Sequence, residues 1–248
     1  MLSSGSDPRL LVIPKRLASV NKVLAVMSSK GGVGKTLISV LLSLALREKG
    51  FKTGLFDLDF TNPSTHIVLG VKPSDVEPIE EKGIIPREVM GVKYLSIVVY
   101  TGDKPTPLRG DAIDDVFREL LAITNWGELD YLVIDTPPGL SDEHLNILTY
   151  LGDKLRVVLV STPSPLSIES TRKLVEVLRD GGYRVLGLVE NMCSNKLTNL
   201  SRELGIDYLA CIPYVSNLDS MLGSPDAIKG TSVWRAILSL ADRIAGSE

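Results

Sequence analysis

The sequence predicts one α/β domain: a doubly wound, mainly parallel sheet with helices on both faces. Short runs that are apolar at consecutive positions, as strands buried on both faces require, alternate with stretches of helical periodicity. The 248 residues, 44% of them hydrophobic, are enough for one large buried sheet, and the composition does not shift along the chain. We expect residues 1–20 to be a poorly ordered lead with one candidate docking contact, at the apolar patch 10–13, and residues 21–248 to form the domain.

Each expected element follows from a local pattern. Consecutive apolar residues predict strands over 23–27, 53–57, 94–100, 131–135, 156–160, 184–189 and 208–212. Apolar residues at helical spacing predict helices over about 35–49, 111–123, 167–179 and 231–245. Residues 73–86 are rich in Pro, Glu and Lys without a period, which predicts a surface loop. Parallel strands end at one edge of a sheet, so ligand-binding residues are expected there.

The segment from Ser28 to Thr36 has the composition of a phosphate-binding loop between the first strand and the first helix. Its glycines allow backbone angles that turn N–H groups toward phosphates. Lys35 supplies a positive charge near the terminal phosphates, and the hydroxyl of Thr36 is suited to bind Mg²⁺. The N-terminus of the following helix favours the same anion. A plain glycine-rich turn is disfavoured, because strand, loop and helix occur in the order that the motif requires.

Three further polar residues lie at or just after the ends of buried strands. Asp135 ends the strand at 131–135 and is followed at once by the chain-breaking Thr-Pro-Pro-Gly. A carboxylate in that place holds the Mg²⁺ shell of a bound nucleotide. Asp57 ends the strand at 53–57, where we expect it to cap the strand end. Asn191 follows the strand at 184–189, and either caps a loop or binds the adenine edge through its amide.

The run Lys30-Gly-Gly-Val-Gly-Lys-Thr36 resembles the deviant Walker A loop of the MinD/ParA superfamily of dimeric ATPases, with Ser29 in place of the usual first glycine. The stretch 126–139 and the segment 190–192 resemble the Mrp (ApbC) branch of iron-sulfur cluster carriers. The similarity covers about residues 22–225. It implies the P-loop NTPase fold.

The resemblance also implies an activity and a site. The activity is slow, Mg²⁺-dependent ATP hydrolysis by a nucleotide-dependent homodimer, which acts in iron-sulfur cluster assembly or transfer and serves an unidentified protein client. The implied catalytic residues are Lys30, which reaches across the dimer interface, Lys35, and Asp59, which orients the attacking water. The implied nucleotide contacts are Gly31, Gly32, Val33, Gly34, Lys35, Thr36, Leu37, Asn191 and Pro213, and the implied Mg²⁺ ligands are Thr36 and Asp135.

The chain has two cysteines, Cys193 and Cys211. Two cysteines do not make a disulfide framework, so we expect free thiols and a reducing compartment. Mrp carriers typically have a Cys-x-x-Cys pair after the Asn-Met segment, and this sequence has none there, which makes a bound cluster doubtful. Cys193 alone lies in the right neighbourhood and is a candidate ligand. The sequence leaves open a second arrangement, in which Cys193 and Cys211 of two subunits together bind one cluster.

Composition bears on partners and location. The net charge of −3 and pI near 5.6 give no overall attraction to nucleic acid or anionic membrane. No apolar run approaches the length of a membrane span, and no signal-peptide core is evident, so we expect a cytoplasmic protein. The helix at 231–245 is expected to pack on the sheet rather than on a membrane. The alternative function is a ParA- or MinD-like module whose nucleotide state switches binding to protein, DNA or membrane.

Overall fold

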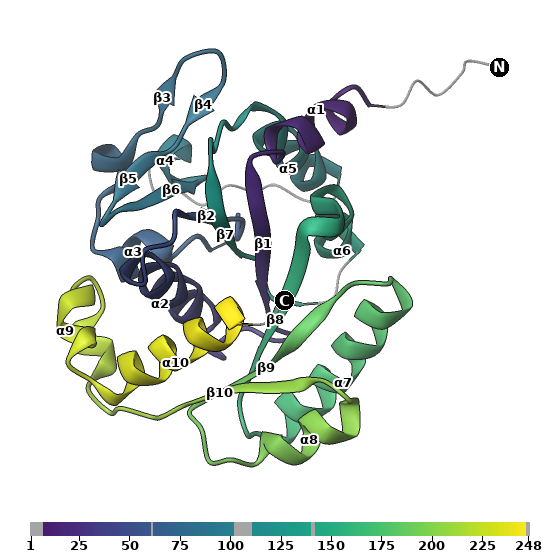
Figure 1. Ribbon diagram of the computed structural model, residues 1–248, viewed down its shortest axis with the longest axis vertical. Coiled ribbons are helices and arrows are strands. Elements are labelled where there is room, and N and C mark those ends of the chain that lie inside the picture. Colours follow the sequence, from purple (N-terminus) through teal and green to yellow (C-terminus); the bar gives the residue numbers. More distant parts are fainter. Residues whose placement is uncertain (1–6, 61, 102–110, 140–141, 247–248) are drawn as a thin grey trace.

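The computed structural model describes residues 7–60, 62–101, 111–139 and 142–246. Among these residues, eight strands form one sheet, which is parallel except for its last strand (Figure 1). The order across the sheet is β10 (Asp207–Ile212), β9 (Val185–Asn191), β8 (Leu155–Ser161), β1 (Val20–Met27), β7 (Leu129–Asp135), β2 (Thr53–Asp57), β6 (Val92–Ser96) and β5 (Arg87–Val89). A short hairpin of β3 (Ile79–Glu80) and β4 (Ile84–Ile85) stands apart. The predicted fold class is confirmed.

Helices cover both faces of the sheet (Figure 1). One face carries α2 (Lys35–Glu48), α3 (Thr65–Leu69), α9 (Pro225–Lys229) and α10 (Ser232–Gly246). The other carries α1 (Arg9–Arg16), α5 (Asp111–Ile123), α6 (Asp142–Leu151), α7 (Pro165–Asp180) and α8 (Leu197–Leu204). Shorter elements are α4 (Val98–Thr101), η1 (Pro73–Val76), η2 (Gly152–Lys154) and η3 (Leu218–Met221).

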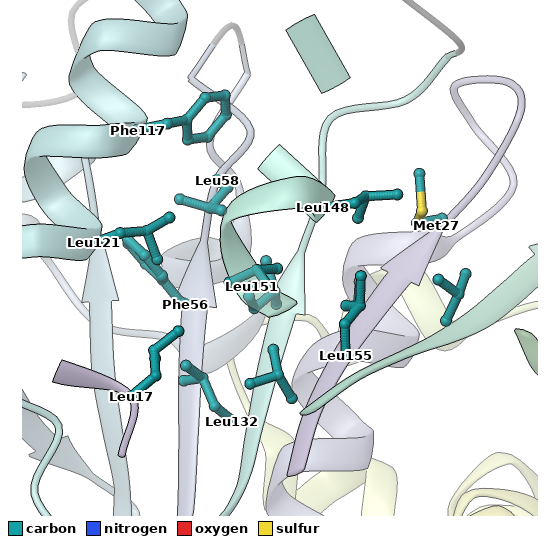
Figure 2. Packing of buried hydrophobic residues seen from close by; sticks show 14 of the residues in the cluster. Leu17, Met27, Phe56, Leu58, Phe117, Leu121, Leu132, Leu148, Leu151 and Leu155 are labelled. Atoms are coloured by element: carbon teal, nitrogen blue, oxygen red, sulfur yellow. The ribbon is translucent and has the colours of Figure 1, made fainter. Parts of the chain in front are cut away.

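The central strand β1 explains why the strands are apolar at consecutive positions. Val23, Ala25 and Met27 belong to the core under α5 and α6. Leu24 and Val26 belong to the core under α2 and α10. Successive side chains point to opposite faces, and both faces are covered over residues 23–27, so these five positions leave no place for a polar residue. Figure 2 shows the first core, where side chains of the strands meet those of α5 and α6.

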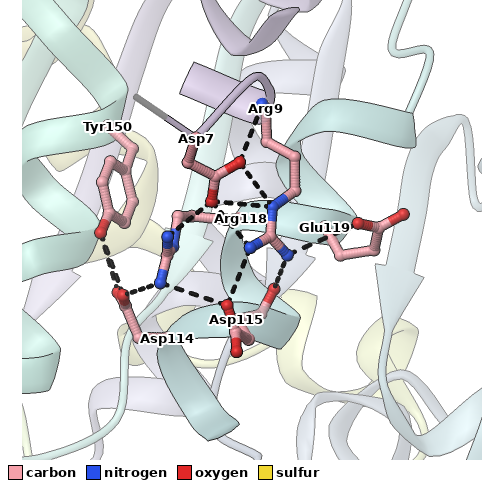
Figure 3. A network of polar contacts seen from close by, with 7 residues as sticks. All are labelled: Asp7, Arg9, Asp114, Asp115, Arg118, Glu119 and Tyr150. Atoms are coloured by element: carbon pink, nitrogen blue, oxygen red, sulfur yellow. Dashed lines mark hydrogen bonds and ion pairs between the residues drawn. The ribbon is translucent and has the colours of Figure 1, made fainter. Parts of the chain in front are cut away.

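The N-terminal segment differs from the prediction of a poorly ordered lead. Residues 9–16 form helix α1, and Ile13 and Leu17 are 1% and 3% exposed in the core. Ion pairs fix its start: Arg9 Nη2 lies 2.8 Å from Asp115 Oδ1. Figure 3 shows this network, which joins Asp7, Arg9, Asp114, Asp115, Arg118, Glu119 and Tyr150. Of the apolar patch at 10–13, Ile13 therefore docks, whereas Leu10, Leu11 and Val12 are exposed. The charges that hold the start of the helix lie more than 100 residues away in sequence.

Three further elements can be compared with the sequence. The strand expected over 94–100 ends at Ser96, and residues 98–101 are helical. The expected loop at 73–86 contains η1 and the β3–β4 hairpin. Helix α10 packs on the sheet through Trp234, Ile237 and Leu240, which are buried. Within the described ranges, no helix combines the length and the apolar character that crossing a membrane requires.

Candidate active site

The phosphate-binding loop connects the end of β1 to the start of α2 at the carboxyl edge of the sheet. Gly32 and Gly34 have φ angles of 77° and 85°, a region that favours glycine. A Cβ atom on Gly34 would also collide with the side-chain amide of Asn191. Both the backbone and the neighbour therefore require glycine at position 34. The loop lies at the helix N-terminus, where a phosphate is favoured.

Three side chains of α2 converge on Asp135. Lys35 Nζ lies 2.7 Å from Asp135 Oδ1, and the hydroxyl of Ser39 donates to the same oxygen at 2.8 Å. The hydroxyl of Thr36 donates to Asp135 Oδ2 at 2.7 Å. Asp135 is fully buried and Lys35 is 5% exposed. A hydroxyl and a carboxylate are the hard oxygen donors that Mg²⁺ prefers, so this donor set fits that ion. Ser39 was not predicted, although it follows Lys35 by one helical turn.

A second carboxylate lies beside the first. Asp57 and Asp135 are register partners at the ends of the neighbouring strands β2 and β7. Asp57 accepts hydrogen bonds from the hydroxyl of Thr65 at 2.6 Å and from the N–H of Asp59 at 3.1 Å. It therefore caps the end of its strand, as the sequence suggested. Burial first, and the negative charge of Asp135 second, raise the pKa of Asp57 to about 7.

This raised pKa predicts how stability depends on pH without nucleotide. Because the folded pKa lies above the ordinary value of 3.8, protonation favours the folded state, and that contribution is lost as the pH rises toward about 7. We expect the protein to be more stable at pH 5.5 than at pH 8 by about 1–2 kcal/mol from this group, measured by urea unfolding. Asp57→Asn should lack that difference, whereas the exposed control Asp219→Asn should keep it. Equal pH dependence in wild type and Asp57→Asn would contradict the assignment.

The remaining predicted site residues lie around the loop. Asp59 is 7% exposed and accepts a hydrogen bond from the N–H of Asn62 at 3.1 Å. Lys30 is half-buried, and Pro213 follows the end of β10. The sequence also named Gly31, Val33 and Leu37, which belong to the loop and the first turn of α2. The structure thus brings the predicted residues to one edge of the sheet.

Asn191 has a contact that the sequence did not predict. Its amide nitrogen donates to the carbonyl oxygen of Val33, within the phosphate-binding loop, at 2.8 Å. The side chain is 6% exposed. Asn191 therefore joins the end of β9 to the loop. No local signal could show this, because 158 residues separate the two partners.

The expectation of two free thiols is wrong in this structure. Cys193 and Cys211 form a disulfide, and their Cα atoms are 5.2 Å apart. The reason is topological: β9 and β10 are neighbours, with Cys211 in register with Glu190. A turn at Met192, with φ of 52°, then brings Cys193 back over β10, where its N–H donates to the carbonyl of Ile212. The described residues contain no group of three or more His, Cys, Asp or Glu side chains arranged to hold a metal ion.

Comparison with known proteins decides the family. The family described as ParA, NUBPL iron-transfer P-loop NTPase, matches residues 19–215. The chain belongs to this NUBPL-type P-loop NTPase family. Membership confirms the predicted fold, the prediction of an ATPase and that of a nucleotide cofactor.

Curated relatives of this NUBPL-type NTPase are named as iron-sulfur assembly factors. The cytosolic Fe-S cluster assembly factor Nubp2 homolog of Drosophila erecta is 37% identical over 183 residues, which cover 71% of this chain and 70% of the relative. The NUBP2 homolog of Nematostella vectensis is 32% identical over 229 residues, covering 84% of this chain and 85% of the relative. The predicted relation to iron-sulfur assembly proteins is thereby confirmed.

Solved structures agree on the fold of this NUBPL-type NTPase. A nucleotide-binding protein from Archaeoglobus fulgidus, solved in complex with ADP, has a TM-score of 0.78 and 29% identity, covering 91% of this chain and 95% of that one. The cell division ATPase MinD of Pyrococcus furiosus has a TM-score of 0.67 and 24% identity, covering 91% and 98%. The second likeness bears on the fold alone.

Proposed function

We propose that this NTPase is a Mg²⁺-dependent, nucleotide-dependent homodimer that hydrolyses ATP and acts in iron-sulfur cluster assembly or transfer in the cytoplasm. The observation that carries the proposal is the convergence of Lys35 and Thr36 on the buried Asp135 at the end of β7. Family membership and the names of the relatives support the cluster-assembly role.

Each residue at this edge has a proposed task. Lys35 and the loop N–H groups bind the β- and γ-phosphates, and Thr36 and Asp135 hold Mg²⁺. Mg²⁺, when bound, draws charge from the transferring phosphoryl group. Asp59 orients the attacking water. Lys30 of the partner subunit adds positive charge where negative charge develops. Asn191 and Pro213 flank the base.

The cluster itself is cargo, and the chain offers few thiolates for it. Clusters generally take four cysteine ligands, whereas this chain has two cysteines, which form one disulfide. Four thiolates therefore require two subunits, each with Cys193 and Cys211 reduced. We propose that a cluster, when carried, bridges two reduced subunits through these residues.

Iron and acid-labile sulfide after anaerobic reconstitution test this role. Wild-type protein, reduced beforehand, is expected to take up one cluster per dimer, seen in both analyses and in the absorbance spectrum. Cys193→Ser and Cys211→Ser should each lose it, because only two of the four cysteine ligands then remain in each pair of subunits. Ser194→Ala, beside Cys193, is the matched control and should keep the cluster. Iron in wild type no higher than in the cysteine variants would leave an ATPase that acts through protein partners instead.

A further inference from the structure

The disulfide between Cys193 and Cys211 lies at the carboxyl ends of β9 and β10, and Asn191 of β9 contacts the phosphate-binding loop. Cys193 follows β9 by two residues, and Cys211 is the next-to-last residue of β10. Both residues are half-buried. A dissolved thiol can therefore reach the sulfur atoms, unlike those of a disulfide sealed in a core.

Two residues, Asn191 and Met192, connect Cys193 of the disulfide to the phosphate-binding loop. Asn191, whose amide donates to Val33 at 2.8 Å and packs against Gly34, forms the near end of this connection. Cys193 forms its far end. Met192, between them, has a φ of 52°, an uncommon conformation for a residue other than glycine, which the surrounding structure must hold. The disulfide thus fixes one end of the turn, at Cys193, and the other end, at Asn191, is hydrogen-bonded to the phosphate-binding loop.

Other contacts hold the neighbouring segment independently of the disulfide. The fully buried carboxylate of Glu190 accepts hydrogen bonds from the N–H groups of Ser194, Lys196 and Leu197, at 2.9, 3.2 and 3.1 Å. The hydroxyl of Tyr208 donates to the same carboxylate at 2.8 Å. Burial, and then this hydrogen bond, raise the pKa of Tyr208 well above its usual range, so the hydroxyl stays a donor. Without the disulfide, the turn at 191–193 would keep, as its main described link to β10, the backbone hydrogen bond from the N–H of Cys193 to Ile212, at 2.9 Å. Reduction would therefore loosen this turn more than the segment that follows it.

We propose that the Cys193–Cys211 pair is a redox modification site that sets the nucleotide affinity of the adjoining loop. With the disulfide closed, Asn191 is held against Val33 and the loop is preorganised for phosphate. With the disulfide open, the turn at Met192 relaxes and the hydrogen bond from Asn191 to Val33 weakens. The loop is then less ordered, and nucleotide binds more weakly. The inference uses the nucleotide site and does not depend on the cluster-assembly role.

The chemistry is thiol-disulfide exchange with a dithiol reductant, of low molecular weight or protein. A reductant thiolate attacks Cys211 Sγ, and the sulfur–sulfur bond breaks with its electron pair passing to Cys193 Sγ, which then takes up a proton. The second reductant thiol displaces Cys211, so that the reductant becomes a disulfide and the protein gains two electrons and two protons. The N–H of Asn195, 3.4 Å from Cys193 Sγ, stabilises Cys193 as the leaving thiolate. Closure runs in reverse, with a small-molecule disulfide as the oxidant.

The test is the ADP dissociation constant of the full chain, measured by calorimetry before and after treatment with dithiothreitol. Reduction is expected to raise that constant roughly fivefold or more. The double variant Cys193→Ser with Cys211→Ser should bind like reduced wild type, with or without reductant. Ser194→Ala keeps both cysteines and should respond like wild type. Alkylation followed by mass spectrometry should find no free thiol in the oxidised protein and two in the reduced protein.

Three results would overturn the inference: equal ADP affinity in both redox states, tighter binding after reduction, or a response to dithiothreitol in the double serine variant. Two free thiols after treatment with a disulfide oxidant would overturn it as well. ADP binding in neither state would overturn the nucleotide site, and the inference with it. A failure of cluster reconstitution leaves the ADP measurements unaffected, so the two proposals fail separately.

Discussion

Replacing Lys35 with alanine is expected to abolish nucleotide binding and to destabilise the nucleotide-free protein by about 3–5 kcal/mol. Both effects follow from the burial of the Lys35–Asp135 pair, whose side chains are 6% and 0% exposed. Without the lysine, Asp135 is left as a buried charge beside Asp57, and among the described residues the hydroxyl groups of Thr36 and Ser39 are its remaining donors. The loop also loses the charge that faces the phosphates.

Two measurements check this prediction. Urea unfolding gives the loss of stability, and the melting temperature with and without Mg²⁺ and ATP gives binding. In wild type, ATP at 100 times its dissociation constant should add about 2.7 kcal/mol of stability. Lys35→Ala should show no such gain. Lys49→Ala, at the other end of the same helix, removes only a surface pair with Asp242 and is the matched control.

A double variant separates binding from folding. Lys35→Ala with Asp135→Asn leaves no unpaired charge, so most of the lost stability should return. Nucleotide binding should not return, because the double variant lacks both the positive charge of Lys35 that faces the phosphates and the carboxylate of Asp135 that binds Mg²⁺. Recovery of nucleotide binding in the double variant would contradict the roles given to these two residues.

The sequence could predict the parts of the site that one continuous segment specifies. The phosphate-binding loop is read from nine consecutive residues, 28–36, and its strand and helix flank it directly. Asp135 is predicted because a strand-ending carboxylate is followed at once by Thr-Pro-Pro-Gly. Parallel strands end at a common edge, so placing these residues together needed only the fold class.

The parts that the sequence could not predict depend on which strands are neighbours. Cys193 and Cys211 are 18 residues apart in sequence, and nothing local shows that β9 and β10 pair in a register that brings them together. The hydrogen bond from the amide of Asn191 to the carbonyl of Val33 likewise joins segments that are distant in sequence. The sequence alone indicates a poorly ordered segment where helix α1 forms, because the residues that bind this helix lie far away in sequence, on α5 around Asp115. Each of these contacts is set by tertiary structure rather than by local propensity.

A large loss of turnover with nucleotide binding retained is expected from Lys30→Ala. The backbone at Lys30 is fixed, since its carbonyl accepts a hydrogen bond from the hydroxyl of Ser28 at 2.9 Å. Among the side chains that the structure describes, which exclude those of Asp142 and Glu143, none forms an ion pair with Lys30. Lys35, five residues away, is by contrast buried against Asp135. The two lysines of one loop therefore have different surroundings, which agrees with one acting on its own nucleotide and the other on a partner's.

Lys30→Ala should keep ATP binding within a few-fold of wild type and lose turnover by about 10³-fold, the usual effect of removing a charge supplied in trans. ATP-dependent dimerisation, measured by light scattering after size exclusion, should be lost as well. Lys196→Ala, an exposed lysine beyond β9, is the control and should turn over normally. Asp59→Ala is the informative contrast, since it should form the ATP dimer and fail to hydrolyse.

Mixing the two inactive variants decides whether Lys30 acts across the dimer. In a mixed dimer, the site of the Lys30→Ala subunit keeps its own Asp59 and receives Lys30 of the partner subunit. Part of the wild-type turnover should therefore return when Lys30→Ala and Asp59→Ala are combined with ATP. If Lys30 acted within its own subunit, every site in the mixture would lack one of the two groups and no turnover would return. Normal hydrolysis by Lys30→Ala alone would show that the partner's lysine has no part in the reaction.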